Sequence, residues 1–197
     1  MYQYRKLSAE DQLALCRERT SKGHPRHAPP HAYEHGGWFL ITAATYERAP
    51  RFSRNEDRAW LLDELNAELT QHEVRASAWV VLPNRYHLLV QVEQLRVVSD
   101  VARKVHARTS RELNRRDHVT GRQVWYRFSD RSIRSERHYR TTLNYIHHNP
   151  VKHGYVALPA EWAASSVHWY LEQWSADALN DLWRDYPVLA YGKGWDD

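Results

Sequence analysis

Two runs of strand-forming residues joined by a very short link constrain the fold of this chain more than any other feature. The runs cover residues 74–82 and 86–92, and Pro83-Asn84 supplies a turn between them. A link this short joins neighbouring strands only when they run antiparallel. The middle of the chain is therefore predicted to be a β-hairpin.

A helix is predicted on each side of this hairpin. Before it, Ser53 and Glu56 form a capping box, and leucines at helical spacing follow until about His72. After it, Ser99-Asp100 is expected to cap a second helix, with valines and a leucine on the apolar side and basic residues opposite.

Two further strands are predicted at residues 38–45 and 124–128, and another helix is expected to begin at Ser135-Glu136. The resulting order is β-α-β-β-α-β followed by one helix. It predicts an α+β fold, namely a ferredoxin-like antiparallel sheet with two packed helices plus an appended helix that carries Tyr145.

Three parts of the chain are expected. Residues 1–36 form an N-terminal extension, with a short helix near residues 9–19 and a proline-containing irregular stretch at 22–30. Residues 37–160 form the domain. Residues 161–197 form a tryptophan-rich tail without a clear period, which we expect to pack on the domain or on a partner.

Composition excludes several classes of protein. The mean hydropathy is −0.78, so no membrane span or membrane partner is expected, and the first residues lack the apolar run of a secretion signal. The single cysteine, Cys16, excludes an internal disulfide framework and a multi-cysteine zinc site. These features predict a cytoplasmic protein.

The charge pattern points towards nucleic acid. Lys and Arg number 28 against 24 acidic residues, and basic residues are dense between Arg96 and Arg140. Nine Trp and twelve Tyr accompany them, and arginine with exposed aromatics suits phosphate neutralisation and base stacking. A solvated helix face and a tryptophan-rich core would explain the same composition.

The side chains best suited to catalysis lie in residues 144–156, which read N-Y-I-H-H-N-P-V-K-H-G-Y-V. Tyr145 and Asn149 are four residues apart, so their side chains lie one above the other on a helix that Pro150 is expected to end. His148 lies on the neighbouring ridge. The motif thus combines a potential nucleophile with potential metal ligands.

A second segment, residues 81–93, reads V-L-P-N-R-Y-H-L-L-V-Q-V-E and places His87 at the start of a strand. Together the two segments resemble the REP-associated tyrosine transposases, which are single-tyrosine members of the HUH nuclease superfamily. The resemblance continues through W-Y-R-F-S-D-R-S-I-R-S-E-R-H and E-W-A-A-S-S-V-H-W-Y and covers roughly residues 36 to 170.

The resemblance implies a DNA endonuclease and strand transferase. Tyr145 would attack a DNA phosphate and form a covalent 5′-phosphotyrosine link, leaving a 3′-hydroxyl. His87 and Asn149 would hold a divalent metal, Mg²⁺ or Mn²⁺, which suits imidazole and carboxamide ligands. The implied substrate is single-stranded or hairpin DNA from repetitive extragenic palindromes.

The chain departs from the family at Arg85, where the family has the first histidine of the HUH pair. A guanidinium stays protonated and cannot donate a lone pair to a metal. Three outcomes are open. Arg85 replaces the metal by binding the phosphate bidentately, or His147 or His148 supplies the missing metal ligand. In the third outcome the site is catalytically inactive, and the chain is a DNA-hairpin-binding protein derived from such a transposase.

Several basic residues are candidates for contacting the DNA backbone. Structured RNA is a weaker alternative ligand, and the sequence leaves open whether the active unit is a monomer or a homodimer. The candidates are Arg103, Lys104, Arg108, Arg111, Lys152 and His153.

Overall fold

The computed structural model describes residues 8, 10–11, 14, 17–18 and 36–193. The chain divides into two compact units, Met1–Glu34 and His35–Asp197. Cys16 and the irregular stretch expected at residues 22–30 lie outside the described residues, and so does most of the helix expected near residues 9–19.

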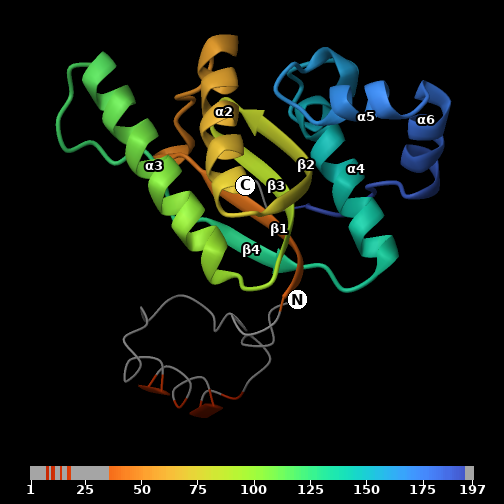
Figure 1. Cartoon of the computed structure of the whole chain (residues 1–197), viewed down its shortest axis with the longest axis horizontal. Coiled ribbons are helices and arrows are strands. Elements are labelled where there is room, and N and C mark those ends of the chain that lie inside the picture. Colours follow the sequence, from red (N-terminus) through yellow and green to blue (C-terminus); the bar gives the residue numbers. More distant parts are fainter. Residues whose placement is uncertain (1–7, 9, 12–13, 15–16, 19–35, 194–197) are drawn as a thin grey trace. The chain divides into compact units, whose positions relative to one another are not determined.

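Four strands form one sheet in the order β2-β3-β1-β4, with antiparallel neighbours throughout (Figure 1). This is the ferredoxin-like order, and the predicted fold class is confirmed. The elements are β1 (Gly37–Ala44), η2 (Tyr46–Arg48), α2 (Asn55–Gln71), β2 (Arg75–Leu82), β3 (Arg85–Val92), α3 (Arg96–Arg116), β4 (Ser129–Ser132), α4 (Glu136–Lys152), η3 (Pro159–Glu161), α5 (Val167–Gln173) and α6 (Ala176–Asp185).

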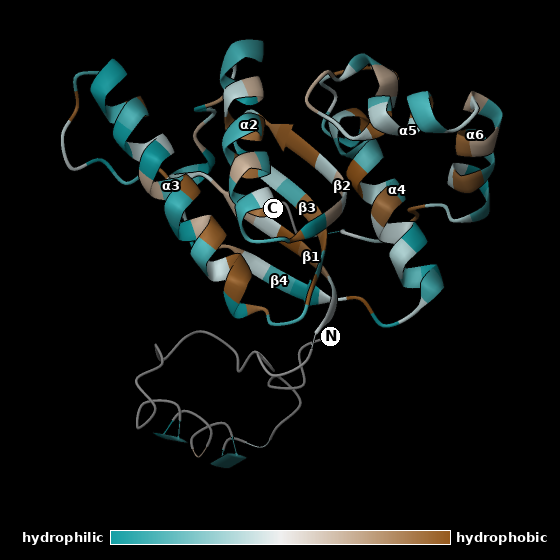
Figure 2. Ribbon diagram, viewed as in Figure 1, coloured by the Kyte–Doolittle hydropathy of each residue, from teal (hydrophilic) through white to brown (hydrophobic). Residues whose placement is uncertain are grey.

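Neighbouring residues of β3 face different helices. The Tyr86 hydroxyl lies 3.0 Å from Nε2 of His106 on α3, whereas the next residue, His87, contacts Tyr145 on α4. Because successive strand side chains point to opposite faces, α3 covers one face of the sheet and α4 the other. Ion pairs join α2 to α3 beside it. Figure 2 shows hydrophobic residues along β2 and in the middle of α4, where these layers meet.

The predicted hairpin is confirmed, because β2 and β3 pair from Leu82 opposite Arg85 outwards. The predicted fourth strand is wrong by five residues. Val124 and Trp125 are buried core residues with a single bridge to Thr45, and the strand that pairs with β1 is the polar Ser129–Ser132. An edge strand needs backbone pairing on one side only, so its apolar content is a poor guide to its position.

Two helix starts differ from the prediction. The Ser53 hydroxyl donates to Pro50 O (2.7 Å), and α2 has no side-chain cap. Helix α3 begins at Arg96, so Ser99-Asp100 lies inside its first turns. No side chain caps this helix either, and its buried apolar residues fix the start in place of a capping residue.

Helix α4 begins as predicted, since Ser135 Oγ accepts a hydrogen bond from the His138 N–H at 3.1 Å. It does not end at Pro150 but continues to Lys152, with His153 as its C-cap. Proline removes only its own N–H from the helix, and the His153 N–H still donates to Asn149 O at 3.1 Å.

The segment after α4 packs on the sheet and on α4. The Val81 N–H donates to Ala164 O and the Ser166 N–H donates to Trp79 O, both at 2.9 Å, so this segment pairs with the outer edge of β2. Trp162 is buried, and its Nε1–H donates to Val81 O. Trp195 lies outside the described residues. Among the helices that the structure describes, none is long and apolar enough to cross a bilayer.

Candidate active site at the β3–α4 interface

Tyr145 faces His87 across the interface between α4 and β3. Their ring centroids are 5.4 Å apart and their planes are 71° apart, an edge-to-face contact. Tyr145 is 1% exposed, and His87 is 1% exposed. The two most informative sequence segments therefore meet, as the interpretation of Tyr145 as a nucleophile beside a histidine requires.

A threonine on the neighbouring strand orients His87. Thr42 of β1 lies directly opposite His87, and its hydroxyl is 2.8 Å from Nδ1 of the imidazole. This hydrogen bond fixes the plane of the ring and leaves Nε2 as the nitrogen that can act on a ligand. Sequence reasoning missed Thr42, because its role depends on the register of β1 against β3.

Asn149 lies one helical turn after Tyr145 and is fully buried. Neither Oδ1 nor Nδ2 has a hydrogen-bond partner among the described residues. An unsatisfied buried polar group costs about 1–3 kcal/mol, which makes this carboxamide a candidate for contacting a ligand.

Arg85 lies two residues before His87 and therefore on the same face of β3. It is 6% exposed, and its Nε–H donates to Asn84 Oδ1 at 3.1 Å. The charge of this guanidinium thus lies at the edge of the face that carries His87.

These residues do not complete a site for a divalent metal. No group of three or more His, Cys, Asp or Glu side chains that could hold a metal occurs among the described residues. The available donors are one imidazole and one carboxamide, both neutral, and the third position holds the cationic Arg85. The fixed positive charge of Arg85 would also repel a divalent cation at this position.

The two histidines next to Tyr145 on α4 differ in their surroundings. His147 is buried, with Trp183 Nε1–H directed at its Nδ1 (3.3 Å) and Ser166 Oγ at its Nε2 (3.1 Å). Burial lowers the pKa of His147 to about 3. Both of its nitrogens are engaged in packing the C-terminal segment, so it is poorly placed to replace a missing metal ligand.

His148 lines a cavity of about 510 Å³ together with Tyr145 and Lys152. Its Nδ1 lies 3.0 Å from Asn144 O, which leaves Nε2 as the nitrogen able to contact a ligand. Burial lowers the pKa of His148, so the neutral imidazole is favoured at neutral pH.

The C-terminal segment closes over the tyrosine. The ring of Tyr191 lies 5.5 Å from that of Tyr145, and a side chain at Gly192 would overlap the Tyr145 ring. Lys152 Nζ lies 5.3 Å from the Tyr145 ring centroid and donates to Gly192 O at 3.2 Å. Lys152 is therefore beside the candidate nucleophile, and the same lysine anchors the segment that covers it.

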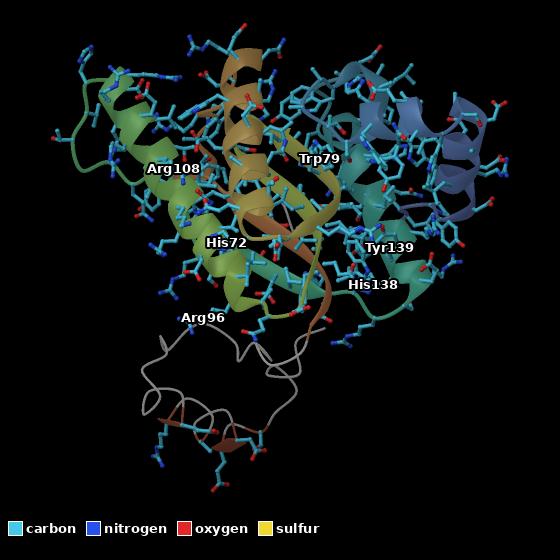
Figure 3. All side chains as sticks on the ribbon, viewed as in Figure 1. His72, Trp79, Arg96, Arg108, His138 and Tyr139 are labelled. Carbon is cyan, nitrogen blue, oxygen red and sulfur yellow. The ribbon has the colours of Figure 1, made fainter. Side chains whose placement is uncertain are left out.

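The four basic candidates on α3 lie on the other face of the sheet. Arg108, visible on α3 in Figure 3, pairs with Glu64 and with the buried Glu68, and Lys104 also pairs with Glu68 at 3.1 Å. Arg103 pairs with Asp100 at 3.3 Å.

Arg111 is exposed, and His153 caps α4 one residue after Lys152. The structure thus places Lys152 and His153 near the end of α4 that carries Tyr145, and it separates Arg103, Lys104, Arg108 and Arg111 from the tyrosine.

Arg131 is a site candidate that sequence reasoning did not single out. It lies opposite Leu40 on β1, and Ser129, on the same face of β4, lies opposite Thr42. Burial lowers the pKa of His138, and the charges of Arg131 and Arg134 lower it further. Nε2 of His138 lies 3.1 Å from the Tyr191 hydroxyl. Because the fourth strand was predicted at residues 124–128, Arg131 was expected to lie in the following loop and was not considered for the site.

Comparisons with known proteins find relatives of this chain. A curated REP-associated tyrosine transposase from Escherichia coli (strain K12) is 32% identical over 95 residues, which is 47% of this chain and 53% of that relative. The match therefore spans about half the length of that protein. No protein-family model matches the sequence.

A putative REP-associated tyrosine transposase from Haemophilus influenzae (strain ATCC 51907 / DSM 11121 / KW20 / Rd) is 30% identical over 151 residues, which is 68% of this chain and 81% of that relative. A solved structure of a REP-associated tyrosine transposase bound to a REP hairpin superposes with a TM-score of 0.60 at 23% identity, covering 74% of this chain and 85% of that one. This likeness supports the fold. The chain belongs to the family of REP-associated tyrosine transposases.

Proposed function

We propose that this protein cleaves and rejoins single-stranded or hairpin DNA of repetitive palindromic type through a covalent link to Tyr145. The observation that carries the proposal is the edge-to-face contact of Tyr145 with His87 at 5.4 Å between ring centroids. Family membership and a relative solved with a REP hairpin support the choice of DNA.

In the proposed step, the Tyr145 phenol loses its proton and its oxygen attacks the phosphorus of a DNA phosphodiester. The bond from phosphorus to the 3′-oxygen breaks, and that oxygen takes up a proton to become a 3′-hydroxyl. The DNA 5′-phosphate stays on the tyrosine. A phenol with an ordinary pKa near 10 needs a neighbouring base or a cation for this attack.

We infer that the guanidinium of Arg85 supplies the positive charge that a metal gives in the HUH pattern. A guanidinium binds two phosphate oxygens through parallel N–H donors, and the position of Arg85 beside His87 suits a bridging phosphate. Asn149 would donate Nδ2–H to the same phosphate, which would satisfy its buried carboxamide. A site for Mg²⁺ or Mn²⁺ would then be restored only by replacing Arg85.

An adduct assay tests this proposal. Wild type, Tyr145→Phe and Arg85→His are incubated with a labelled REP-type hairpin, with and without Mn²⁺, and analysed by denaturing electrophoresis. The wild type should form a denaturation-resistant adduct and Tyr145→Phe should form none. No adduct from wild type under either condition would refute the nuclease proposal.

A second candidate is a hairpin-binding protein without nuclease activity. It is favoured by the incomplete set of metal ligands around Arg85. It predicts salt-sensitive hairpin binding without an adduct. Calorimetry with Mn²⁺ then distinguishes the roles of Arg85, because Arg85→His should bind the ion measurably and wild type should not. Equal heats from both proteins would contradict the role given to Arg85.

A further inference from the structure

Two exposed tyrosines lie against each other where β1 ends. Tyr46 and Tyr126 are 37% and 42% exposed, and their ring centroids are 4.9 Å apart with planes at 44°. The Tyr46 N–H donates to Val124 O at 2.7 Å, and the Tyr126 N–H donates to Ala44 O at 2.9 Å. Their backbones are therefore fixed, while much of both rings faces solvent.

Trp125, the residue directly before Tyr126, is buried, whereas Tyr126 is exposed. Trp125 is 6% exposed and lies 5.3 Å from Phe52 and 5.6 Å from Tyr86, between ring centroids, in the core on the α3 face. Because consecutive residues of an extended segment point to opposite sides, Tyr126 points away from the α3 face. Core packing accounts for Trp125 but not for the exposed pair.

Hydrogen bonds through Asn84 connect the turn that contains Tyr46 to Arg85. The Thr45 N–H donates to Asn84 O at 2.9 Å, and Asn84 Nδ2–H donates to Arg48 O at 3.2 Å, which ties the turn after Tyr46 to the β2–β3 hairpin. Arg85 Nε–H donates to Oδ1 of the same Asn84 at 3.1 Å. Asn84 therefore forms hydrogen bonds both with the turn that contains Tyr46 and with the arginine of the candidate site.

The charges beside the pair favour a nucleic acid strand. Arg48 and Arg127 are exposed next to Tyr46 and Tyr126, and Glu47 is the one acidic side chain adjacent to them in sequence. Arg127 takes part in no ion pair with a described residue. Exposed aromatic rings flanked by arginines are the arrangement that single-strand-binding surfaces use.

We propose that Tyr46 and Tyr126 form a stacking platform for an unpaired nucleobase adjacent to the phosphate bound at Arg85. This inference rests on the proposed function, since it assigns the path of the DNA strand next to that site. Stacking tolerates any base, so the platform holds unpaired DNA without reading its sequence. Losing one stacked base should weaken binding about 5- to 150-fold.

Binding to two hairpins tests the platform. One hairpin ends flush, and the other carries a short single-stranded extension with 2-aminopurine, whose fluorescence falls when the base stacks. Tyr46→Ala and Tyr126→Ala should each weaken binding of the extended hairpin about 5- to 150-fold and abolish the quenching. Binding of the flush hairpin should stay within about twofold of wild type.

Two sets of controls separate stacking from other effects. Tyr46→Phe and Tyr126→Phe keep the ring and should behave like wild type. Tyr155→Ala removes another exposed tyrosine, 43% exposed and stacked on Trp162, and should also leave binding unchanged.

Equal affinity of wild type and the alanine variants for the extended hairpin would overturn the platform while leaving the proposed function intact. An equal loss for both hairpins would overturn it as well, because the platform is assigned to a base of the single-stranded extension. If wild type bound neither hairpin, the proposed function would be refuted, and the platform, which rests on it, would be refuted as well.

Discussion

Replacing Gly192 by alanine tests whether the C-terminal segment closes over Tyr145. Gly192 has φ +78, a left-handed conformation that glycine adopts without cost. A Cβ at this position would overlap Cε2 of the Tyr145 ring and approach Cδ2 to 2.9 Å. The ring is itself buried between His87 and Tyr191, so it has little room to move away.

The backbone conformation of Gly192 and the overlap with the Tyr145 ring both disfavour the closed segment in Gly192→Ala. The left-handed conformation alone costs an L-residue about 1–2 kcal/mol, which corresponds to roughly a 5- to 30-fold shift towards the open segment. The overlap with the ring adds to this cost. The closed arrangement should therefore be depopulated by at least that factor, while the sheet and α4 remain folded.

Hydrogen exchange reads the change directly. The amides of Tyr191 and Lys193 donate to Val188 O and Ala190 O, and both should lose protection by about 5- to 30-fold or more in Gly192→Ala. The initial rate of DNA adduct formation should rise in parallel because Tyr145 becomes accessible.

Gly121→Ala is the matched control for this experiment. It has a similar φ, +71, but a Cβ there meets nothing within 4 Å. It should leave the protection of the C-terminal segment unchanged. If the two variants showed the same protection at Tyr191, the closure over Tyr145 would be refuted.

Two further outcomes concern stability. Lowering the pH from 7.5 to 5 should destabilise the fold, because burial lowers the pKa of His147 to about 3 and that of His106 to about 4. The unfolded chain takes up these protons near pH 6.5, so each histidine contributes a loss of up to roughly 1.4 kcal/mol per pH unit below that value. Urea unfolding at both pH values checks this, and a pH-independent free energy of unfolding would contradict it. Arg108→Ala should cost roughly 1–3 kcal/mol, because buried Glu68 loses one of its cations, whereas exposed Arg111→Ala should cost under about 0.5 kcal/mol. Chemical denaturation compares the two, and equal effects would contradict the assigned pairing.

The β2–β3 hairpin and the placement of Tyr145 and Asn149 on α4 were predictable because local signals determine them. The two-residue turn at Pro83-Asn84 fixes the hairpin, and the spacing of Tyr145 and Asn149 places both on one side of α4. Ser135 marks the start of that helix through its cap. Each of these features depends on residues close together in the sequence.

The features that sequence reasoning missed depend on long-range pairing. The polar strand β4 has no apolar pattern, so its register, and with it the position of Arg131, is visible only against β1. The contact of Gly192 with Tyr145 joins segments 47 residues apart without any motif. The same limit applied to Thr42, which acts through its cross-strand partner.

Identifying the amino acid that carries the DNA tests the central claim most directly. Trypsin should release residues 141–152 as one peptide, and Tyr145 is its only tyrosine. After reaction with a hairpin and digestion of the DNA, mass spectrometry should find a nucleotide 5′-phosphate on this peptide. A nucleotide found on a different peptide, or on none while the hairpin is bound, would contradict the assignment of Tyr145 as the nucleophile.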